Sequence, residues 1–505
     1  MALLWMGEHD DLNREVVGGK AHSLNRMHRL GLPVPPAFVL TTDECARFFA
    51  AGERLGEDLL AQVRRAVHTL EERTGRRFGD TERPLLVSVR SGAARSMPGM
   101  MDTILNLGIN DEVEAALRTQ TQDAGYASGT HRRFTEQFES VVGQAAPPDP
   151  WEQLIAAIGA VFRSWRSPRA VAYRRHHGIG DDGGTSVTVQ AMVFGNLDDF
   201  SGTGVLFTRN PLTGESDPYG EWLPRGQGED VVSGRHDPLP LSALAEQQPQ
   251  VHRELLAAAA RLEEVGKDVQ DIEFTVESGK LWLLQARPAK RSPDAAVRLA
   301  VALHADGLLT AEVALSRVTS EQVAAVCRPR VAPEAKASAT LVARGEPACP
   351  GVGIGRVVLE VEEAEELADS GVEVVLARPT TDPDDVSGMI VSSAILTEIG
   401  GSTSHAAVVS RELGTPCVVG CGQGELAALA GRQVTVDGTT GEVFEGALPL
   451  APCTEADNPA LAALLSWARA LVPGVDGSPA AVFQAARDAL AGKATDRSAT
   501  EPAAK

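Results

Sequence analysis

Several features that would place a protein in a particular class are scarce in this sequence. Only 6 of the 505 residues are cysteines, too few and too dispersed for a disulfide framework. The formal net charge of −21 argues against nucleic acid or an acidic membrane as a general partner. No apolar run reaches the length of a membrane-spanning helix, about 18 residues or more, and the N-terminus lacks the pattern of a signal peptide. We therefore expect a cytoplasmic protein with no membrane or nucleic-acid partner.

The chain is long enough for two or three domains, and changes in pattern indicate where they meet. A Pro-rich break, QAAPPDP, precedes a helical stretch predicted over residues 151–175. Residues 293–328 have a helical pattern that is polar on one face. Residues 341–448 then alternate Gly-rich turns with short Val-rich strands and one or two helices, as in a compact β/α module. The Ala- and Pro-rich remainder ends in ATDRSATEPAAK, which we expect to be disordered.

The most informative segment runs from Gly400 to Gly422 and reads GGSTSHAAVVSRELGTPCVVGCG. His405 follows a glycine pair and three small hydroxyl residues, and it opens an apolar stretch that is typical of a helix start. The N–H groups and the positive end of such a helix would stabilise a phosphate on the imidazole, and a neutral imidazole is a nucleophile at pH 7. No partner stands at the spacing of a catalytic triad or a zinc site. A capping loop with a satisfied histidine is the alternative that the residues leave open.

A predicted hairpin carries a second group of candidate residues. Asp271 and Glu273 are two positions apart on its first strand, hence on one face, and Gln285 and Arg287 are related in the same way on its second strand. If the strands pair, carboxylates, an amide oxygen and a guanidinium converge. That is the set needed to hold Mg²⁺ against phosphate oxygens. A surface hairpin with cross-strand ion pairs is the alternative.

Two basic residues near the N-terminus suit the same ligand. Lys20 follows two glycines at a helix start, where the backbone can approach phosphate oxygens. The spacing is not that of a Walker A loop, so a helix N-terminus with a solvated lysine is the alternative. Arg90 ends the predicted strand LLVSV and opens a loop rich in small residues and methionine. A guanidinium at a strand end can grip a polyphosphate, although the methionines could equally fill a core.

Together these segments resemble the enzymes that use phosphoenolpyruvate, and in particular the pyruvate, phosphate dikinase family. The run from Gly400 is similar to the family's phosphohistidine signature, with Ser402 in place of a usual methionine and Ser410 in place of a usual alanine. The segments around Lys20, Arg90 and the hairpin, with SGTGVLFTRNPLTGE and GQGEDVVSG between them, match its ATP-grasp nucleotide-binding domain in order. The resemblance implies a multidomain α/β fold with an ATP-grasp domain over residues 1–290, a helical connector over 291–340, a swivelling β/β/α phosphohistidine domain over 341–450 and an Ala/Pro-rich tail over 451–505.

The resemblance also implies roles for individual residues. His405 would carry the phosphoryl group, with Arg287 and Arg90 on the phosphates. Glu273 and Gln285 would bind Mg²⁺. Other nucleotide-site residues are implied at Lys20, Arg133, Thr203, Glu229, Asp230 and Asp271. Thr403 matches a threonine at which plant members of the family are regulated by phosphorylation.

The implied chemistry turns ATP, phosphate and His405 into AMP, pyrophosphate and phosphohistidine. This is the nucleotide half of the reaction that converts ATP, pyruvate and phosphate to AMP, phosphoenolpyruvate and pyrophosphate. The family normally continues into a (β/α)₈ barrel that binds pyruvate and phosphoenolpyruvate, and this sequence has no such segment, so we expect a separate barrel-bearing protein to supply the pyruvate half. The sequence is also compatible with a homodimer. The alternatives are a dikinase-type phosphotransferase acting on another small molecule, such as an antibiotic, and a nucleotide-binding regulatory relic.

Overall fold

The computed structural model describes residues 2–10, 12–95, 97, 100–176, 178–181, 183–232, 238–401, 403–452 and 455–500. Contacts between residues divide the chain into two compact units. The first comprises Met1–Thr203, Pro224–Gln227 and Glu273–Arg287, and the second comprises Gly204–Leu223, Gly228–Ile272 and Pro288–Lys505. The expected domains and these units do not share all their boundaries, because Gly204–Leu223 and Gly228–Ile272 belong to the second unit although they lie within the expected domain 1–290.

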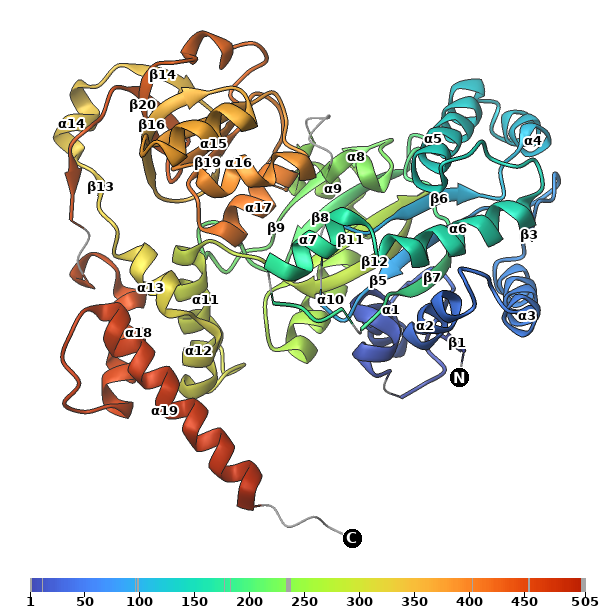
Figure 1. Ribbon diagram of the computed structural model, residues 1–505, viewed down its shortest axis with the longest axis horizontal. Helices are drawn as coiled ribbons and strands as arrows, with labels where there is room; N and C mark the ends of the chain where they lie inside the picture. The colour runs from blue at the N-terminus through green and yellow to red at the C-terminus, as the bar shows by residue number, and fades with distance from the viewer. Residues whose placement is uncertain are drawn as a thin grey trace. The chain divides into compact units, whose positions relative to one another are not determined.

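The first unit is built on an antiparallel five-stranded sheet (Figure 1). Its order is β1 (Leu3–Trp5), β2 (Ala37–Leu40), β7 (Ser186–Ala191), β5 (Val87–Gly92) and β6 (Thr103–Leu107). The helices of this unit are α1 (Arg14–Arg29), α2 (Thr42–Ala50), α3 (Glu57–Thr74), α4 (Asp111–Thr121), α5 (Ala124–Val142), α6 (Pro150–Ser164) and α7 (Pro168–His176). Val87 and Val89 alternate with polar neighbours on β5 and pack into a core with aromatic residues of α5 and α6. The other face of β5 is thereby free to present polar side chains.

The helix predicted over residues 151–175 is divided into α6 and α7. Pro168 begins α7, and a proline cannot continue a helix from the preceding turn because it lacks the N–H donor and clashes with that turn. Asp149 caps α6 by accepting from the N–H of Trp151. The helical character was therefore predicted, and its interruption was not.

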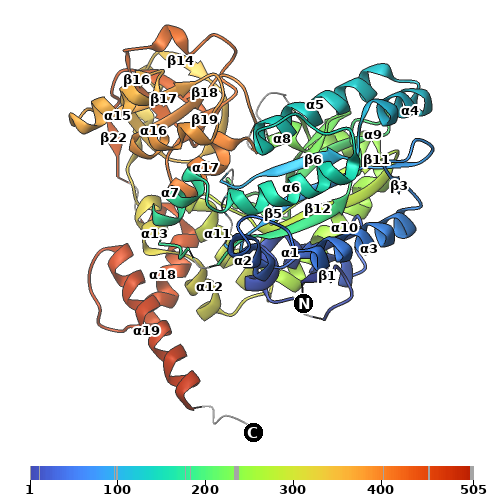
Figure 2. The same cartoon turned by 45° about the vertical axis from the view of Figure 1, so that its right-hand side comes forward.

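A second five-stranded sheet contains the predicted hairpin (Figure 2). Its order is β10 (Leu239–Pro240), β9 (Tyr219–Pro224), β8 (Gly202–Phe207), β11 (Gln270–Glu277) and β12 (Lys280–Pro288). The turn between β11 and β12 has positive φ at Ser278 (48°) and Gly279 (75°), as a tight hairpin connection requires. Helices α8 (Gly228–Val232), α9 (Leu241–Gln247) and α10 (Pro249–Gly266) lie between its strands in the sequence.

Helices from two distant parts of the second unit form one bundle (Figure 1). The connector forms α11 (Pro293–Ala305), α12 (Ala311–Arg317), α13 (Ser320–Val326) and α14 (Pro333–Ser338), and the presumed tail forms α18 (Pro459–Leu471) and α19 (Pro479–Thr500). Leu461, Leu464 and Phe483 are buried against Leu299 and Leu303. Residues 494–500, which we expected to be disordered, continue α19. Residues 501–505 lie outside the described residues.

The predicted β/α module is an eight-stranded mixed sheet with helices α15 (Val361–Asp369), α16 (Val386–Val391) and α17 (His405–Leu413). Its order is β14 (Leu341–Arg344), β21 (Glu442–Glu445), β20 (Gln433–Asp437), β16 (Val352–Val358), β17 (Val374–Arg378), β18 (Ala394–Thr397), β19 (Cys417–Val419) and β15 (Glu346–Cys349). Strands β16 to β19 are parallel. Val374 and Leu376 enter one apolar cluster and Val375 and Ala377 another, so both faces of β17 are buried, as is usual for parallel strands.

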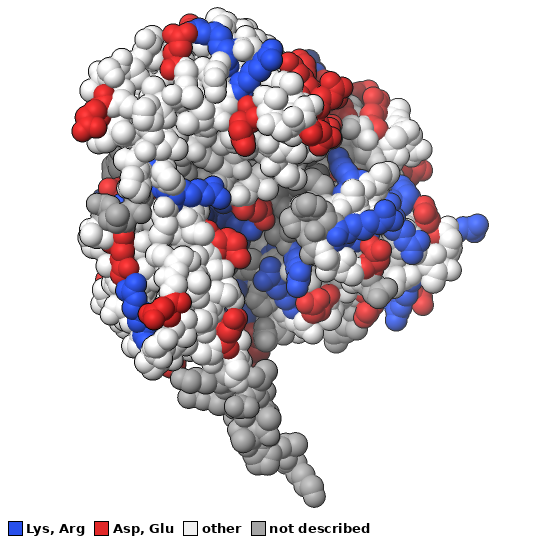
Figure 3. Space-filling model, turned by 60° about the vertical axis from the view of Figure 1, so that its left-hand side comes forward, with Lys and Arg blue, Asp and Glu red and all other residues white. Residues whose placement is uncertain are grey.

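The surface carries charges of both signs. On the face drawn in Figure 3, Lys and Arg side chains are interspersed with Asp and Glu among the described residues. Within the described ranges, no helix combines the length and the apolar character needed to cross a bilayer.

Candidate functional site

Five of the predicted residues come together in the first unit. The Arg90 guanidinium lies 3.9 Å from the Glu273 carboxylate, measured between Nη2 and Oε2. The amide nitrogen of Gln285 donates to Oε1 of Glu273 over 3.3 Å. Lys20 interacts electrostatically with Arg90, Glu273 and Arg287. Residues 271–285 thus form the expected hairpin, and a carboxylate, an amide and guanidinium groups meet where β5 and α1 approach β11 and β12.

The cluster gathers three basic side chains around Glu273. Burial and the positive charges of Arg90 and Arg287 together lower the pKa of Lys20 to about 7, while Glu273 opposes the shift. Although Lys20 keeps some solvent-accessible area, its ammonium group is closely surrounded by protein. A polyphosphate is the kind of ligand that such a group of basic side chains can bind.

A glycine allows Lys20 to reach this position. Gly18 has φ of +76° within α1, which a residue with a side chain rarely adopts. A Cβ atom at Gly18 would lie 2.3 Å from the carbonyl oxygen of Gly92. The start of α1 therefore packs directly on the end of β5, and the chain delivers Lys20 and Arg90 to one place.

The oxygens present fit a magnesium ion held together with phosphate. Mg²⁺ is usually bound in nucleotide sites through one or two carboxylates, water and substrate phosphates. Glu273 supplies a carboxylate that is partly exposed, and Gln285 supplies an amide oxygen beside it. The described residues contain no group of three or more His, Cys, Asp or Glu side chains placed to hold a metal by themselves, so the ligand would have to complete the coordination.

The remaining predicted nucleotide residues are distributed more widely, and their roles stay predictions. Asp271 is buried on β11, two positions before Glu273. The hydroxyl of Thr203 on β8 donates to the carbonyl of Phe274 over 3.0 Å, which gives it a partner inside the sheet. Arg133 lies at an exposed position on α5. Asp230 belongs to α8, as does Glu229, whose side chain lies outside the described part of the structure.

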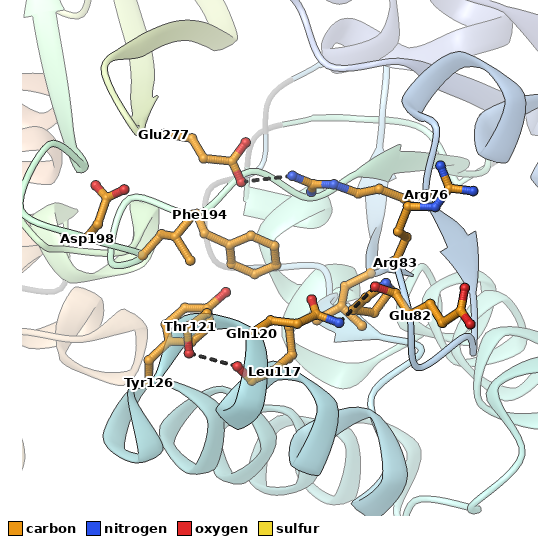
Figure 4. A pocket seen from close by; sticks show the side chains of 13 residues that line it. Arg76, Glu82, Arg83, Leu117, Gln120, Thr121, Tyr126, Phe194, Asp198 and Glu277 are labelled. Atoms are coloured by element: carbon orange, nitrogen blue, oxygen red, sulfur yellow. Dashed lines mark hydrogen bonds and ion pairs between the residues drawn. The ribbon is translucent and has the colours of Figure 1, made fainter.

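A cavity of about 490 Å³ lies further along the strands that carry the cluster (Figure 4). The edge-on pair of Phe194 and Tyr126, with ring centroids 5.9 Å apart, contributes to its lining. Arg76 and Glu277 form an ion pair of 3.4 Å at its border. In Figure 4, Tyr126 rises from α5 on one side, while Arg76 and Glu277 face each other on the opposite side. The cavity thus combines an apolar, aromatic wall with a charged rim.

Tyr126 gives this cavity a hydrogen-bond donor. Its side chain is 6% exposed and contributes to the lining of the cavity. Burial raises the pKa of Tyr126 above its usual value, and Glu277 raises it further. The hydroxyl therefore stays protonated and can donate to a ligand in the cavity.

The cavity and the charged cluster share one face. Leu86 lines the cavity and precedes Arg90 by four residues, and Glu277 follows Glu273 by four residues. Residues an even number of positions apart on a strand leave the same face, and four residues span about 13 Å. A ligand that is ionic at one end and planar at the other would match this arrangement.

His405 occupies the predicted helix start in the second unit. It is the first residue of α17, which follows β18, and its Nδ1 lies 3.1 Å from the hydroxyl of Thr381, which follows β17. Because β17 and β18 are adjacent and parallel, both residues lie at the carboxyl edge of the sheet, where ligand sites of such sheets are found. Spacing alone did not reveal Thr381, although its place after a Val-rich strand was a signal.

The surroundings keep the imidazole neutral and leave a donor beside it. Burial lowers the pKa of His405, against the opposing charges of Asp382 and Asp385. The Ser404 side chain is 4% exposed, and its hydroxyl has no hydrogen-bond partner in the described ranges. Together with the N–H groups at the start of α17, this hydroxyl could bind an anion on the histidine. Ser402, a departure from the expected signature, lies outside the described residues.

The loop before His405 contacts strand β9. The hydroxyl of Thr403 donates to Oε2 of Glu221, and both side chains are buried. Sequence analysis did not single out Glu221, because the two residues are 182 positions apart. The regulatory role of Thr403 stays a prediction.

Comparison with known proteins identifies two matching family models. One, described as "Pyruvate phosphate dikinase, AMP/ATP-binding domain", matches residues 52–254 and 239–304, and the other, "PEP-utilising enzyme, mobile domain", matches residues 371–441. Both matches agree with the predicted order of a nucleotide-binding domain followed by a mobile domain. The predicted multidomain α/β fold is thereby confirmed.

Curated relatives extend the match over most of the chain. The pyruvate, phosphate dikinase of Clostridium symbiosum is 38% identical over 505 aligned residues, which cover 88% of this chain and 58% of that protein. The enzyme of the same name from Rhizobium meliloti (strain 1021) is 40% identical, with 87% and 56% covered. Pyruvate, phosphate dikinase 2 of Zea mays is 40% identical, with 90% and 58% covered. The chain thus spans less than two thirds of the length of these relatives.

Proposed function

The chain belongs to the pyruvate, phosphate dikinase family, and we propose that it transfers a phosphoryl group from ATP to His405. The reaction consumes ATP and phosphate and yields AMP, pyrophosphate and phosphohistidine. The bond from the β-phosphorus to the α,β-bridging oxygen breaks as a bond from that phosphorus to nitrogen forms, and AMP leaves. A phosphate oxygen bonds to the γ-phosphorus, the bond from the γ-phosphorus to the β,γ-bridging oxygen breaks, and pyrophosphate leaves. The observation that carries this proposal is the placement of His405, with a neutral ring held by Thr381 at the start of α17.

The imidazole is oriented for attack through Nε2. When Nδ1–H donates to the Thr381 hydroxyl, the lone pair of Nε2 is free to act as the nucleophile. The lowered pKa keeps this lone pair available at neutral pH. Once the phosphoryl group is attached, the Ser404 hydroxyl and the N–H groups of α17 donate to its oxygens.

The charged cluster of the first unit binds the polyphosphate. Lys20, Arg90 and Arg287 neutralise the phosphate oxygens, and this requires no reorganisation because their positions are fixed by α1, β5 and β12. Glu273 and Gln285 would hold Mg²⁺, which supplies charge neutralisation on the phosphates when it is bound. Positioning and charge neutralisation, rather than covalent chemistry by this cluster, would provide the acceleration.

The cavity of Figure 4 takes the base and ribose of ATP in this proposal. It lies about 13 Å along the strands from the cluster, which suits the extent of a nucleotide. Phe194 and Tyr126 provide an aromatic wall for the base, and the Tyr126 hydroxyl provides a donor.

The physiological acceptor in this proposal is pyruvate. This assignment rests on the named activity of the relatives. A cytoplasmic location and a homodimer are predictions, which cell fractionation and a mass measurement in solution would test.

Labelling with ATP tests the proposed function. Mg·ATP labelled at the β-phosphate should transfer label to the protein, in a form that is stable to base and labile to acid. His405→Ala should abolish the label while nucleotide binding is retained. His68→Ala, at an exposed position on α3, is a matched control and should label normally. Label that persists in His405→Ala would refute the assignment.

A further inference from the structure

Among the contacts that join the histidine module to neighbouring parts of the second unit, three involve strand β9 or helix α17. Thr403 donates to Glu221 of β9, and the hydroxyl of Tyr219, two positions earlier on the same strand, donates to Glu346 over 2.9 Å. Because residues two apart leave the same strand face, β9 presents Tyr219 and Glu221 together. The third contact is an ion pair of 2.8 Å between Lys290 and Glu412, near the end of α17.

The contact at Glu221 differs from the other two because it is buried. Glu221 is 6% exposed and Thr403 is 3% exposed, whereas the side chains of Lys290 and Glu412 are 52% and 31% exposed. A buried carboxylate is costly unless it is hydrogen-bonded, so Glu221 depends on donors such as Thr403. Exposed ion pairs contribute little to stability. The contact between Glu221 and Thr403 is therefore the one that can fix the loop.

Gly401 shows how closely this loop approaches Glu221. A Cβ atom at this position would lie 2.7 Å from Oε1 of Glu221, which is too close for any side chain without a shift. The loop therefore covers the carboxylate from one side, while Thr403 binds it from the other end of the same turn. Ser404 donates its N–H to the carbonyl of Gly401 over 3.0 Å and closes that turn directly before His405.

We propose that Glu221 is a positioning residue, which holds the loop before His405 on strand β9 while the histidine receives its phosphoryl group. This role rests on the proposed function, because it concerns the same transfer. Glu221 lies on β9, which has β10 and β8 as neighbours in its sheet, so the loop is held by a strand that is paired on both sides. Glu221 acts through Thr403 and takes no part in bond making.

The first experiment measures the contact without any reaction. Hydrogen exchange of the amides over residues 403–408 should accelerate in both Glu221→Leu and Thr403→Val, because each removes one partner of the buried bond. Thr403→Ser keeps the hydroxyl and should restore protection. Glu445→Gln, which breaks an ion pair with Arg432 on the surface of the same module, is a matched control and should leave the exchange unchanged. Unchanged exchange in both variants would overturn the proposal.

The second experiment measures the rate of His405 phosphorylation in a single turnover. A hydrogen bond to a charged group is worth a factor of about 10 to 100, so Glu221→Leu and Thr403→Val should each slow labelling by that factor. The double variant should be no slower than the slower single variant, since both remove the same bond. The Kd for ATP and the midpoint of thermal unfolding should stay near the unsubstituted values.

The outcomes separate the two proposals. Faster exchange with an unchanged labelling rate would overturn the positioning role, and so would additive effects in the double variant. A loss of labelling that is matched by a loss of ATP binding would also overturn it. Absence of label in the unsubstituted protein would overturn the proposed function and the positioning role with it.

Discussion

Lys20 makes nucleotide binding depend on a proton. Burial and two neighbouring guanidinium groups hold its pKa at about 7 in the free protein. A bound polyphosphate favours the charged ammonium group and should return the pKa towards its ordinary value of about 10.4. ATP binding should therefore be accompanied by proton uptake at Lys20.

The expected uptake follows from the pKa of about 7. A group with that pKa is about half protonated at pH 7 and about one-tenth protonated at pH 8, so Lys20 should take up about 0.5 and about 0.9 protons at these pH values. Protons are taken up rather than released, because the protonated form of Lys20 is the one that binds the anionic phosphates. The Kd for ATP should therefore rise as pH increases above 7, approaching about tenfold per pH unit while the bound form stays protonated.

Calorimetry in pairs of buffers with different ionisation enthalpies measures this uptake directly, with a non-hydrolysable ATP analogue and Mg²⁺ present. Lys20→Arg keeps the charge at every pH, so the uptake at pH 8 should disappear in that variant. Lys20→Met should also show no uptake and should bind more weakly at pH 6. The link between Lys20 and the phosphates would be refuted if the unsubstituted protein took up no protons at pH 8. It would also be refuted if Lys20→Arg took up as many protons as the unsubstituted protein.

Two further predictions concern the transfer itself. Glu273→Ala and Arg287→Ala should each reduce the rate of AMP formation by a factor of about 10² to 10³. Glu277→Gln, four positions further along β11, should change the affinity for ATP more than that rate. Near-normal turnover in the first two variants would place the active site elsewhere. Thr381→Val should slow His405 phosphorylation by a factor of about 3 to 10, the worth of one neutral hydrogen bond, and should leave ATP affinity unchanged; an unaltered rate would show that the Nδ1 contact does not orient the ring.

The hairpin could be predicted because its information is local. Alternation along DIEFTV and KLWLLQ places Asp271 and Glu273 on one face and Gln285 and Arg287 on one face, and the short turn forces the strands to pair. The hydrogen bond between Gln285 and Glu273 follows from this local pattern alone. The position of His405 can be predicted in the same way, since the residues around it specify a helix start.

The remaining parts of the site depend on long-range packing. The approach of Gly18 to Gly92, and the contact of Thr403 with Glu221, join segments that are far apart in the sequence, and no periodicity reports them. The C-terminal helices were missed for another reason. Leu461, Leu464, Leu465 and Ala468 follow helical spacing, but the high alanine content of the surrounding residues was interpreted as a tail.

The chain enters and leaves the histidine module side by side. Strand β13 (Arg330–Val331) pairs with β22 (Leu450–Ala451) in an antiparallel ribbon, and the module lies between them in the sequence. Its two ends are thus adjacent, as in a domain inserted into a host, and the host is the bundle that α18 and α19 complete. Because the two connecting segments are adjacent, the module can rotate about the axis between them, whereas twisting it would strain both segments. A domain inserted in this way can be exchanged between proteins during evolution without disturbing its own core or that of the host.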